Sequence, residues 1–236
     1  MELYVTGNTH GDFSRFRPES FYEQEKLTKA DIVLIAGDFG GVWYGDSRDD
    51  AGLDFLESRP FTTAFVSGNH ENYDALAGYP QTEWHGGRVR VIRPSVLMLE
   101  RGQVFGLGGR RFFAMGGASS HDIQDGILDP EAPDFLQRFQ QLDASGAAFR
   151  VNHRSWWKEE LPSETEYAEA KASLDQAALP ASRTTCWGRC PSRTPSPTSW
   201  KRWTGGADSS TTSSGTATVT RSSGKDMCCC TSRSYG

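Results

Sequence analysis

Residues 32–41 read IVLIAGDFGG and decide the fold, because five consecutive apolar residues run straight into a turn that contains glycine and aspartate. An uninterrupted apolar run of this length is typical of a strand covered on both faces. Two further segments repeat the plan, since residues 3–12 read LYVTGNTHGD and residues 64–71 read AFVSGNHE. The sequence therefore predicts three strands, over residues 3–5, 32–36 and 64–66, each ending in a polar turn.

The turns that follow these strands hold the candidate functional residues. In an open α/β sheet, ligands bind outside the carboxyl ends of the strands, so we expect the three turns to meet at one crevice. Glycine beside the polar residues lets the backbone turn sharply there. The side chains gathered in this way are Asn8, His10, Asp38, Asn69 and His70. Carboxylate and amide oxygens together with imidazole nitrogens are ligands of divalent ions such as Mn, Fe or Zn, so the turns predict a metal site.

The rest of residues 1–180 predicts an α/β domain with one mixed sheet or with two sheets. Helices are expected over residues 18–29 and 50–57, between the first three strands. Strand-sized runs separated by turn residues follow, in the manner of a meander, over residues 89–92, 95–99, 103–107 and 111–115. Two more helices are expected over residues 133–142 and 163–179, and the second opens with the capping-box spacing of Ser163 and Glu166.

These motifs resemble the calcineurin-like metallophosphoesterases. The pattern of that family runs Asp-x-His, Gly-Asp, Gly-Asn-His-Glu/Asp, a lone His and finally Gly-His-x-His. The resemblance covers about residues 1–180 and is specific for the first three blocks; residues 116–122 (GGASSHD) and the Trp156-Trp157 region look like a bacterial branch. It implies a four-layer α/β/β/α sandwich of mixed sheets around two divalent metal ions, and hydrolysis of a phosphomonoester or phosphodiester.

The resemblance also implies a role for each matching residue. His10 would bind the first metal, Asp38 would bridge both metals, and Asn69 would bind the second. His70 would be the catalytic imidazole, which suits a group that titrates near neutral pH. Two cations bridged by a carboxylate lower the pKa of a bound water and hold the phosphate for in-line attack.

The sequence departs from the family pattern at both ends of the motif series. Asn8 stands where the pattern has aspartate, and a neutral amide is a poorer ligand for a divalent ion than a carboxylate. No histidine follows His153, so the last two blocks have no counterpart. His121 and His153 lack ligand spacing and are interpreted as loop or surface residues. One alternative is therefore an impaired remnant that binds at most one metal or a phosphate; another is a nucleotide-binding module, which no glycine-rich phosphate loop supports.

Residues 181–236 differ in composition from the rest of the chain. They include 12 Ser and 11 Thr but no Leu, Ile or Phe, and they carry a net charge of +6 where residues 1–180 carry −11. Such a segment cannot bury a core of its own, so we expect an unstructured tail after a single metallophosphoesterase domain over residues 1–180. All five cysteines of the chain lie in this tail, without metal-site or disulfide spacing, and are interpreted as incidental thiols.

A frameshift near residue 182 would explain this change of composition. If each codon takes its first base from the third position of the preceding one, residues 213–218 permit Phe-Phe-Gly-His-Arg-His. The three adjacent tail cysteines then become codons for Leu, Met or Val. We therefore hypothesise that a frameshift, genuine or from sequencing, has replaced the last quarter of a metallophosphoesterase, and the coding DNA tests this.

Charge and hydropathy indicate the setting in which the protein works. The net charge of −5 and the pI of about 5.6 argue against nucleic acid as a charge-driven partner. No run approaches the roughly 20 apolar residues of a membrane span, and no basic-then-apolar leader precedes the first strand. We therefore expect a cytoplasmic enzyme with a phosphate-ester substrate and no membrane contact.

Overall fold

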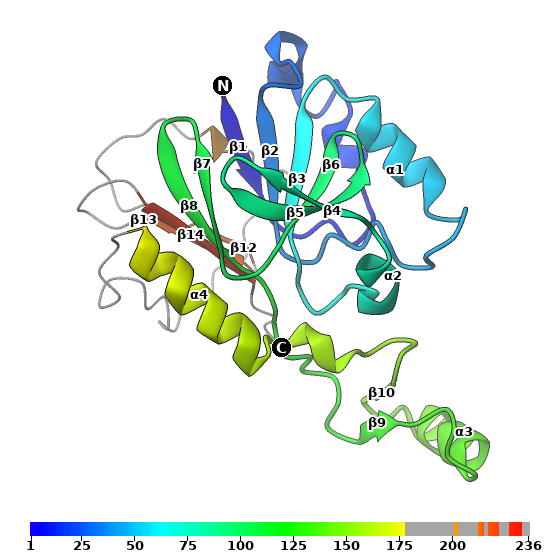
Figure 1. Cartoon of the computed structure of the whole chain (residues 1–236). Helices are drawn as coiled ribbons and strands as arrows, with labels where there is room; N and C mark the ends of the chain where they lie inside the picture. The colour runs from blue at the N-terminus through cyan, green and yellow to red at the C-terminus, as the bar shows by residue number, and fades with distance from the viewer. Residues whose placement is uncertain (178–200, 203–211, 215–216, 222–226, 233–236) are drawn as a thin grey trace.

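The larger of two main sheets is built around the first three predicted strands. The computed structural model describes residues 1–177 and, beyond them, residues 201–202, 212–214, 217–221 and 227–232. Strands β1 (Leu3–Thr6), β2 (Ile32–Ala36) and β3 (Thr62–Val66) pair in parallel, as predicted. The sheet has the order β11-β1-β2-β3-β6-β5-β4 (Figure 1). Its other strands are β4 (Gln81–Trp84), β5 (Gly87–Arg93), β6 (Val96–Leu99) and β11 (Lys201–Arg202).

The second sheet has five strands in the order β12-β13-β14-β8-β7. The predicted hairpin forms between β7 (Gln103–Leu107) and β8 (Arg110–Met115), which are antiparallel. The remaining strands lie within residues 181–236 and are β12 (Thr212–Ser214), β13 (Ala217–Arg221) and β14 (Met227–Ser232). The rest of that segment, including all of residues 178–200, lies outside the described residues, so the expected unstructured tail and frameshift stay predictions.

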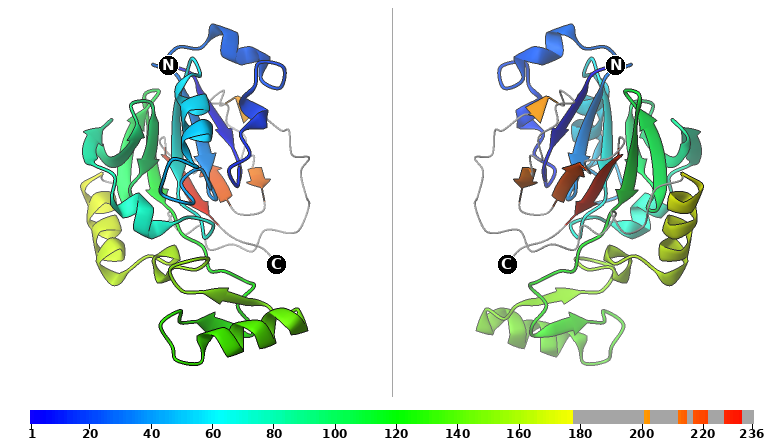
Figure 2. Two further views of the ribbon diagram at one scale, coloured as in Figure 1. Left: turned by 90° about the vertical axis from the view of Figure 1, so that its right-hand side faces the viewer. Right: turned by 90° about the vertical axis from the view of Figure 1, so that its left-hand side faces the viewer.

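Both faces of the larger sheet are covered, as the continuous apolar runs predict. Along β2, Ile32, Leu34 and Ala36 join the core shared with residues of the second sheet. Alternate residues Val33 and Ile35 join the opposite core, beneath α1 (Asp50–Glu57) and the aromatic segment that follows β1. Because side chains alternate along a strand, a strand buried on both sides must be apolar throughout. The protein is a mixed α/β sandwich with helices outside the sheets (Figure 2).

Helix α4 (Glu164–Gln176) covers the outer face of the second sheet. Its start is fixed by the predicted capping box, in which Ser163 Oγ accepts from the Glu166 amide and the Glu166 carboxylate accepts from the Ser163 amide. Ala170 and Leu174 pack with Phe113 of β8 in a third, smaller apolar cluster. The helix thereby completes the four layers α/β/β/α.

The prediction of an α-helix over residues 18–29 is wrong. The structure has one short 3-10 helix within this range, at Tyr22–Lys26, and another just before it, at Ser14–Phe16. The buried Phe16, Phe21 and Leu27 are five and six positions apart, a spacing that does not form one stripe on an α-helix. Gln24 Nε2 donates to the carbonyl oxygens of Phe16 and Phe21 and stabilises the tighter turns.

Residues 116–162 form a segment that projects from the sandwich and then returns to it. Here β9 (Gly126–Leu128) and β10 (Phe149–Val151) pair in parallel, and α3 (Phe135–Ser145) lies beside them, away from the sheets (Figure 1). The chain returns through a 3-10 helix at Lys158–Glu160, followed by α4. Helix α2 (Tyr73–Ala77) lies between β3 and β4. Within the described part of the chain, no helix has the length and apolar character to cross a bilayer.

Candidate metal centre

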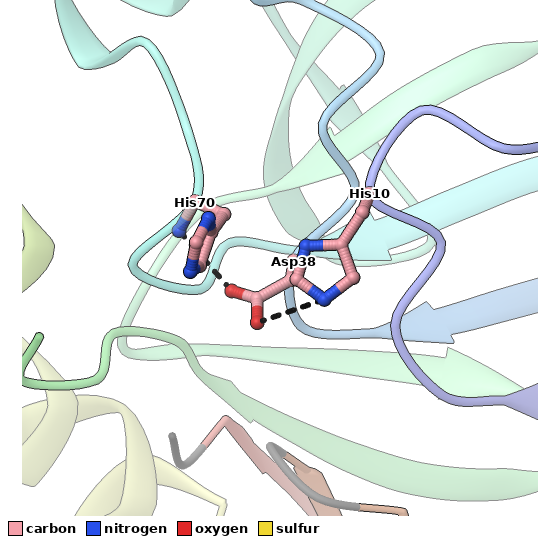
Figure 3. Close-up of side chains that lie close together, drawn as sticks. All are labelled: His10, Asp38 and His70. Atoms are coloured by element: carbon pink, nitrogen blue, oxygen red, sulfur yellow. Dashed lines mark hydrogen bonds and ion pairs between the residues drawn. The ribbon is translucent and has the colours of Figure 1, made fainter. Parts of the chain in front are cut away.

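His10, Asp38 and His70 come together at the carboxyl ends of β1, β2 and β3 (Figure 3). One ligand atom from each of the three lies within 4.8 Å of the others. Asp38 is 1% exposed, whereas the two imidazoles lie nearer to solvent, with their ring centroids 4.9 Å apart. His10 Nε2 lies 3.8 Å from Asp38 Oδ2, and the His70 amide donates to Asp38 Oδ1 over 3.2 Å. The strand-end turns therefore meet, as the topology predicts.

The backbone of these turns is held in an unusual conformation. His10 and Asp38 have φ values of 48° and 42°, in the left-handed region that L residues other than glycine rarely adopt. The amides of Thr9 and His10 both donate to the Asp38 carbonyl, over 3.0 and 2.9 Å. A Cβ atom on Gly68 would lie 1.8 Å from Asp38 Oδ1, so only glycine fits at that position. Strain of this kind persists where surrounding contacts fix a functional geometry.

Glu71 ties the turn after β3 to the turn after β2. Its side chain is fully buried, and Oε1 accepts from the amides of Phe39 (2.7 Å) and Gly68 (3.4 Å). Oε2 accepts from the Gly40 amide over 3.2 Å. Burial raises the pKa of Glu71 to about 8, and the nearby charge of Asp38 acts in the same direction. Sequence analysis placed Glu71 in the motif without a role; the structure makes it the link between two turns.

Asn8 occupies its predicted position at the centre. Its Nδ2 donates to Asp38 Oδ2 over 2.8 Å and lies 3.3 Å from His10 Nε2. Its Oδ1 is buried and has no hydrogen-bond partner among the residues that the structure describes. A buried polar atom without a partner in the protein keeps its bonding capacity for a ligand or a water.

Asn69 presents a second buried oxygen without a partner. Its Oδ1 has no hydrogen bond, whereas its Nδ2 donates to Ser120 Oγ over 3.3 Å. Ser120 donates from its amide and from its hydroxyl to the buried carboxylate of Glu160, over 2.7 and 2.6 Å. Burial raises the pKa of Glu160, while the Ser120 hydrogen bonds oppose that rise. Sequence analysis missed this support, because no local pattern connects residues 69, 120 and 160.

These donors fit a divalent ion. The centre gathers the carboxylate of Asp38 with the imidazoles of His10 and His70. In the same turns, the amide oxygens of Asn8 and Asn69 have no hydrogen-bond partner among the described residues. Donors of these types suit ions of intermediate hardness. Ligand groups held by second partners, as Asn69 is by Ser120, are typical of metal sites. His153 lies elsewhere and pairs with Asp74 over 2.8 Å, and the exposed His121 is likewise outside the cluster.

His70 lies beside Asp38 and is half-buried. Burial lowers the pKa of its imidazole below the ordinary value, and His10 acts in the same direction, whereas the charge of Asp38 opposes both. In this environment the neutral imidazole is favoured at neutral pH, so one ring nitrogen carries a proton and the other accepts. His70 can therefore donate a hydrogen bond or take up a proton at the mouth of the site.

The comparisons with known proteins give one match. Residues 1–188 match the family model described as calcineurin-like phosphoesterase. The match covers all three strand-end turns and the residues that support Asn69. No curated protein and no solved structure matches the chain.

Proposed function

The chain belongs to the calcineurin-like phosphoesterase family, and we propose that it hydrolyses a phosphomonoester or phosphodiester at a site for two divalent metal ions. In this proposal Asp38, His10, Asn8 and Asn69 would hold the ions, with Asp38 shared between them, His10 and Asn8 at the first and Asn69 at the second. The observation that carries it is the pair of buried, unpartnered amide oxygens, Asn8 Oδ1 and Asn69 Oδ1, in the turns around Asp38. The metals, when bound, would neutralise phosphate charge and supply an activated water.

The protein's own residues have distinct tasks in this reaction. Glu71 and the strained turn at Asp38 hold the ligand groups in place before substrate arrives, which avoids reorganisation during the reaction. Among the described residues, His70 hydrogen-bonds to Asp38 through its backbone amide, which leaves the nitrogens of its nearby imidazole for the substrate. We assign its ring N–H to a hydrogen bond with the phosphoryl or leaving oxygen, where it stabilises the developing negative charge.

A non-catalytic remnant is the second candidate function. Two observations favour it: Asn8 supplies no charge where the family pattern has aspartate, and the sequence has no histidine after His153 to complete the ligand set. Such a protein would bind one metal ion or a phosphate through His10, Asp38 and Asn69, without turnover.

Metal analysis combined with an ester assay separates the two functions. The full-length protein is treated with EDTA, reloaded with Mn²⁺, and assayed with p-nitrophenyl phosphate and bis(p-nitrophenyl) phosphate. Two ions per chain with turnover support the enzyme, whereas one ion or none without turnover supports the remnant. Asp38→Ala should abolish both metal binding and turnover. Asp175→Ala, which removes an exposed carboxylate on α4 paired only with Lys171, is the matched control.

A further inference from the structure

A cavity of about 450 Å³ opens directly beside the metal centre. His10 and His70 form the part of its wall that faces Asp38. The aromatic side chains of Phe13, Trp43 and Tyr44 line it further out, together with glycines of the strand-end turns. Its volume lies in the range of small-molecule sites. A substrate with its phosphate at the metals would place its leaving group here.

The aromatic wall is held in position before any ligand arrives. The buried Asp49 carboxylate accepts from the Tyr44 amide (3.0 Å) and the Gly45 amide (2.7 Å). Asn72 Nδ2 donates to the Trp43 carbonyl over 2.8 Å, and the ring of the buried Trp157 lies edge-on to that of Trp43 at 5.8 Å. A rigid aromatic surface binds a flat ligand with little loss of conformational entropy.

The Tyr44 hydroxyl has no hydrogen-bond partner among the described residues, and Arg48 covers one face of the Tyr44 ring, so only the other face can stack on a ligand. The residue is 53% exposed, and the Arg48 guanidinium lies 3.9 Å from its ring centroid. Arg48 is itself paired with Asp46 over 2.8 Å, so its charge is already neutralised. Among the described residues, neither Tyr44 Oη nor Trp43 Nε1 has a hydrogen-bond partner. The wall thus combines stacking surface with free polar edges, and it lacks an unpaired cation for a second phosphate group.

We propose that this cavity binds the base of a nucleoside monophosphate, whose 5′-phosphate lies at the metal centre. A heterocyclic base stacks on aromatic rings through its face and hydrogen-bonds through its edge, whereas an aliphatic sugar phosphate does neither. The proposal rests on the proposed function for the position of the phosphate. To that function it adds the class of substrate, namely a nucleotide whose base stacks on Tyr44 and Trp43.

Adenosine 5′-monophosphate and ribose 5-phosphate form a matched pair of substrates. Both release the same primary alkoxide, so the ratio of their kcat/KM values reports on the base alone. From typical stacking contributions we expect the nucleotide to be preferred by about 5- to 150-fold. Tyr44→Ala should reduce this preference toward one. Tyr22→Ala removes a tyrosine that is 70% exposed and does not line the cavity, so it should leave the preference unchanged.

Calorimetric titration with adenosine and with ribose gives a readout that needs neither metal nor turnover. We expect adenosine to bind and ribose not to bind, and Tyr44→Ala to weaken adenosine binding. Equal kcat/KM values for both phosphates, with no adenosine binding, would overturn the nucleotide inference while leaving the phosphoesterase function intact. Adenosine binding without hydrolysis of either phosphate would support the cavity and overturn the proposed function. Melting temperatures show that each variant is folded.

Discussion

Replacing Asn8 with aspartate tests the metal centre, because the effect of the substitution on stability should change sign when Mn²⁺ is added. In the structure Asn8 Nδ2 donates to Asp38 Oδ2 over 2.8 Å, a contact that two ionised carboxylates cannot make. Without metal, Asn8→Asp should therefore destabilise the protein. With Mn²⁺ present, the same carboxylate should bind a divalent cation, and the substitution should then stabilise the protein.

The size of both effects follows from that one contact. A hydrogen bond to a charged group contributes about 1.5–3 kcal/mol, and its loss leaves Asp38 without this donor. Repulsion between two charges 4 Å apart adds up to about 4 kcal/mol near a protein surface, an upper limit because one carboxyl can take up a proton. We expect metal-free Asn8→Asp to lose about 2–4 kcal/mol, which lowers Tm by about 4–15 °C for a chain of this size. Mn²⁺ affinity should rise at least tenfold, or about 1.4 kcal/mol.

Thermal melts in EDTA and in a Mn²⁺ series, with calorimetric titration of Mn²⁺, measure both changes. Asn8→Ala removes the hydrogen bond without adding charge, and Asn152→Asp adds the same charge outside the centre. An Asn8→Asp protein that melts like the wild type in EDTA and binds Mn²⁺ no more tightly would refute a cation site between residue 8 and Asp38.

The other expectations concern catalysis, ligand support, acid stability and the coding DNA. His70→Ala should lower turnover while leaving the metal content unchanged; loss of metal in this variant would assign His70 as a ligand instead. Ser120→Ala frees the Asn69 amide and should weaken Mn²⁺ binding about 10- to 100-fold in calorimetry, whereas an unchanged affinity would remove Ser120 from the site. Burial opposes ionisation of Asp31, but hydrogen bonds from backbone amides and from Thr28 outweigh it, so the pKa of Asp31 lies below its usual 3.8. The stabilisation that these hydrogen bonds give to the folded protein is fully present above pH 3.8 and is lost as the pH falls through the pKa of Asp31 in the folded state. Asp31→Asn should therefore cost about 1–3 kcal/mol in urea melts at pH 7, and the difference from wild type should shrink as the pH falls below 3.8; a constant difference would contradict the lowered pKa. Sequencing the DNA around codon 182 should reveal a second frame with Gly-His-x-His codons, and their absence would end the frameshift hypothesis.

Matched controls separate these effects from general damage to the fold. His153→Ala removes an exposed imidazole outside the metal cluster and controls for His70→Ala. Ser119→Ala, which alters the exposed neighbour of Ser120, controls for Ser120→Ala. Asp175→Asn removes an exposed helical carboxylate and controls for Asp31→Asn.

The strands and the turns after them were predictable because burial on both faces leaves a local signature. Residues 32–36 are apolar throughout since neighbouring side chains enter different cores. The start of α4 was equally predictable from the sequence, because the capping box of Ser163 and Glu166 satisfies backbone amides within one turn. The 3-10 segments after β1 could not be predicted in the same way. The segment that begins at Pro18 is long enough for an α-helix, but the buried apolar residues in and just before it do not have helical spacing.

Parts of the candidate centre that depend on distant contacts left no such signature. Ser120 and Glu160 are 40 residues apart, and their link to Asn69 exists only after the excursion through α3 returns to the sandwich. The aromatic wall was equally hidden, because Tyr44 and Trp43 are set in place by Asp49 and Asn72 through backbone hydrogen bonds. The candidate ligand groups could be proposed from the sequence, but the residues that orient them could not.

Anomalous diffraction from crystals of the full-length protein soaked in MnCl₂ would locate the cation directly. We expect a manganese peak within coordination distance of the Asp38 carboxylate, with His10 and at least one of the amide oxygens of Asn8 and Asn69 as further ligands. An empty centre at saturating Mn²⁺, or manganese bound only to exposed carboxylates elsewhere, would contradict the metal-dependent function.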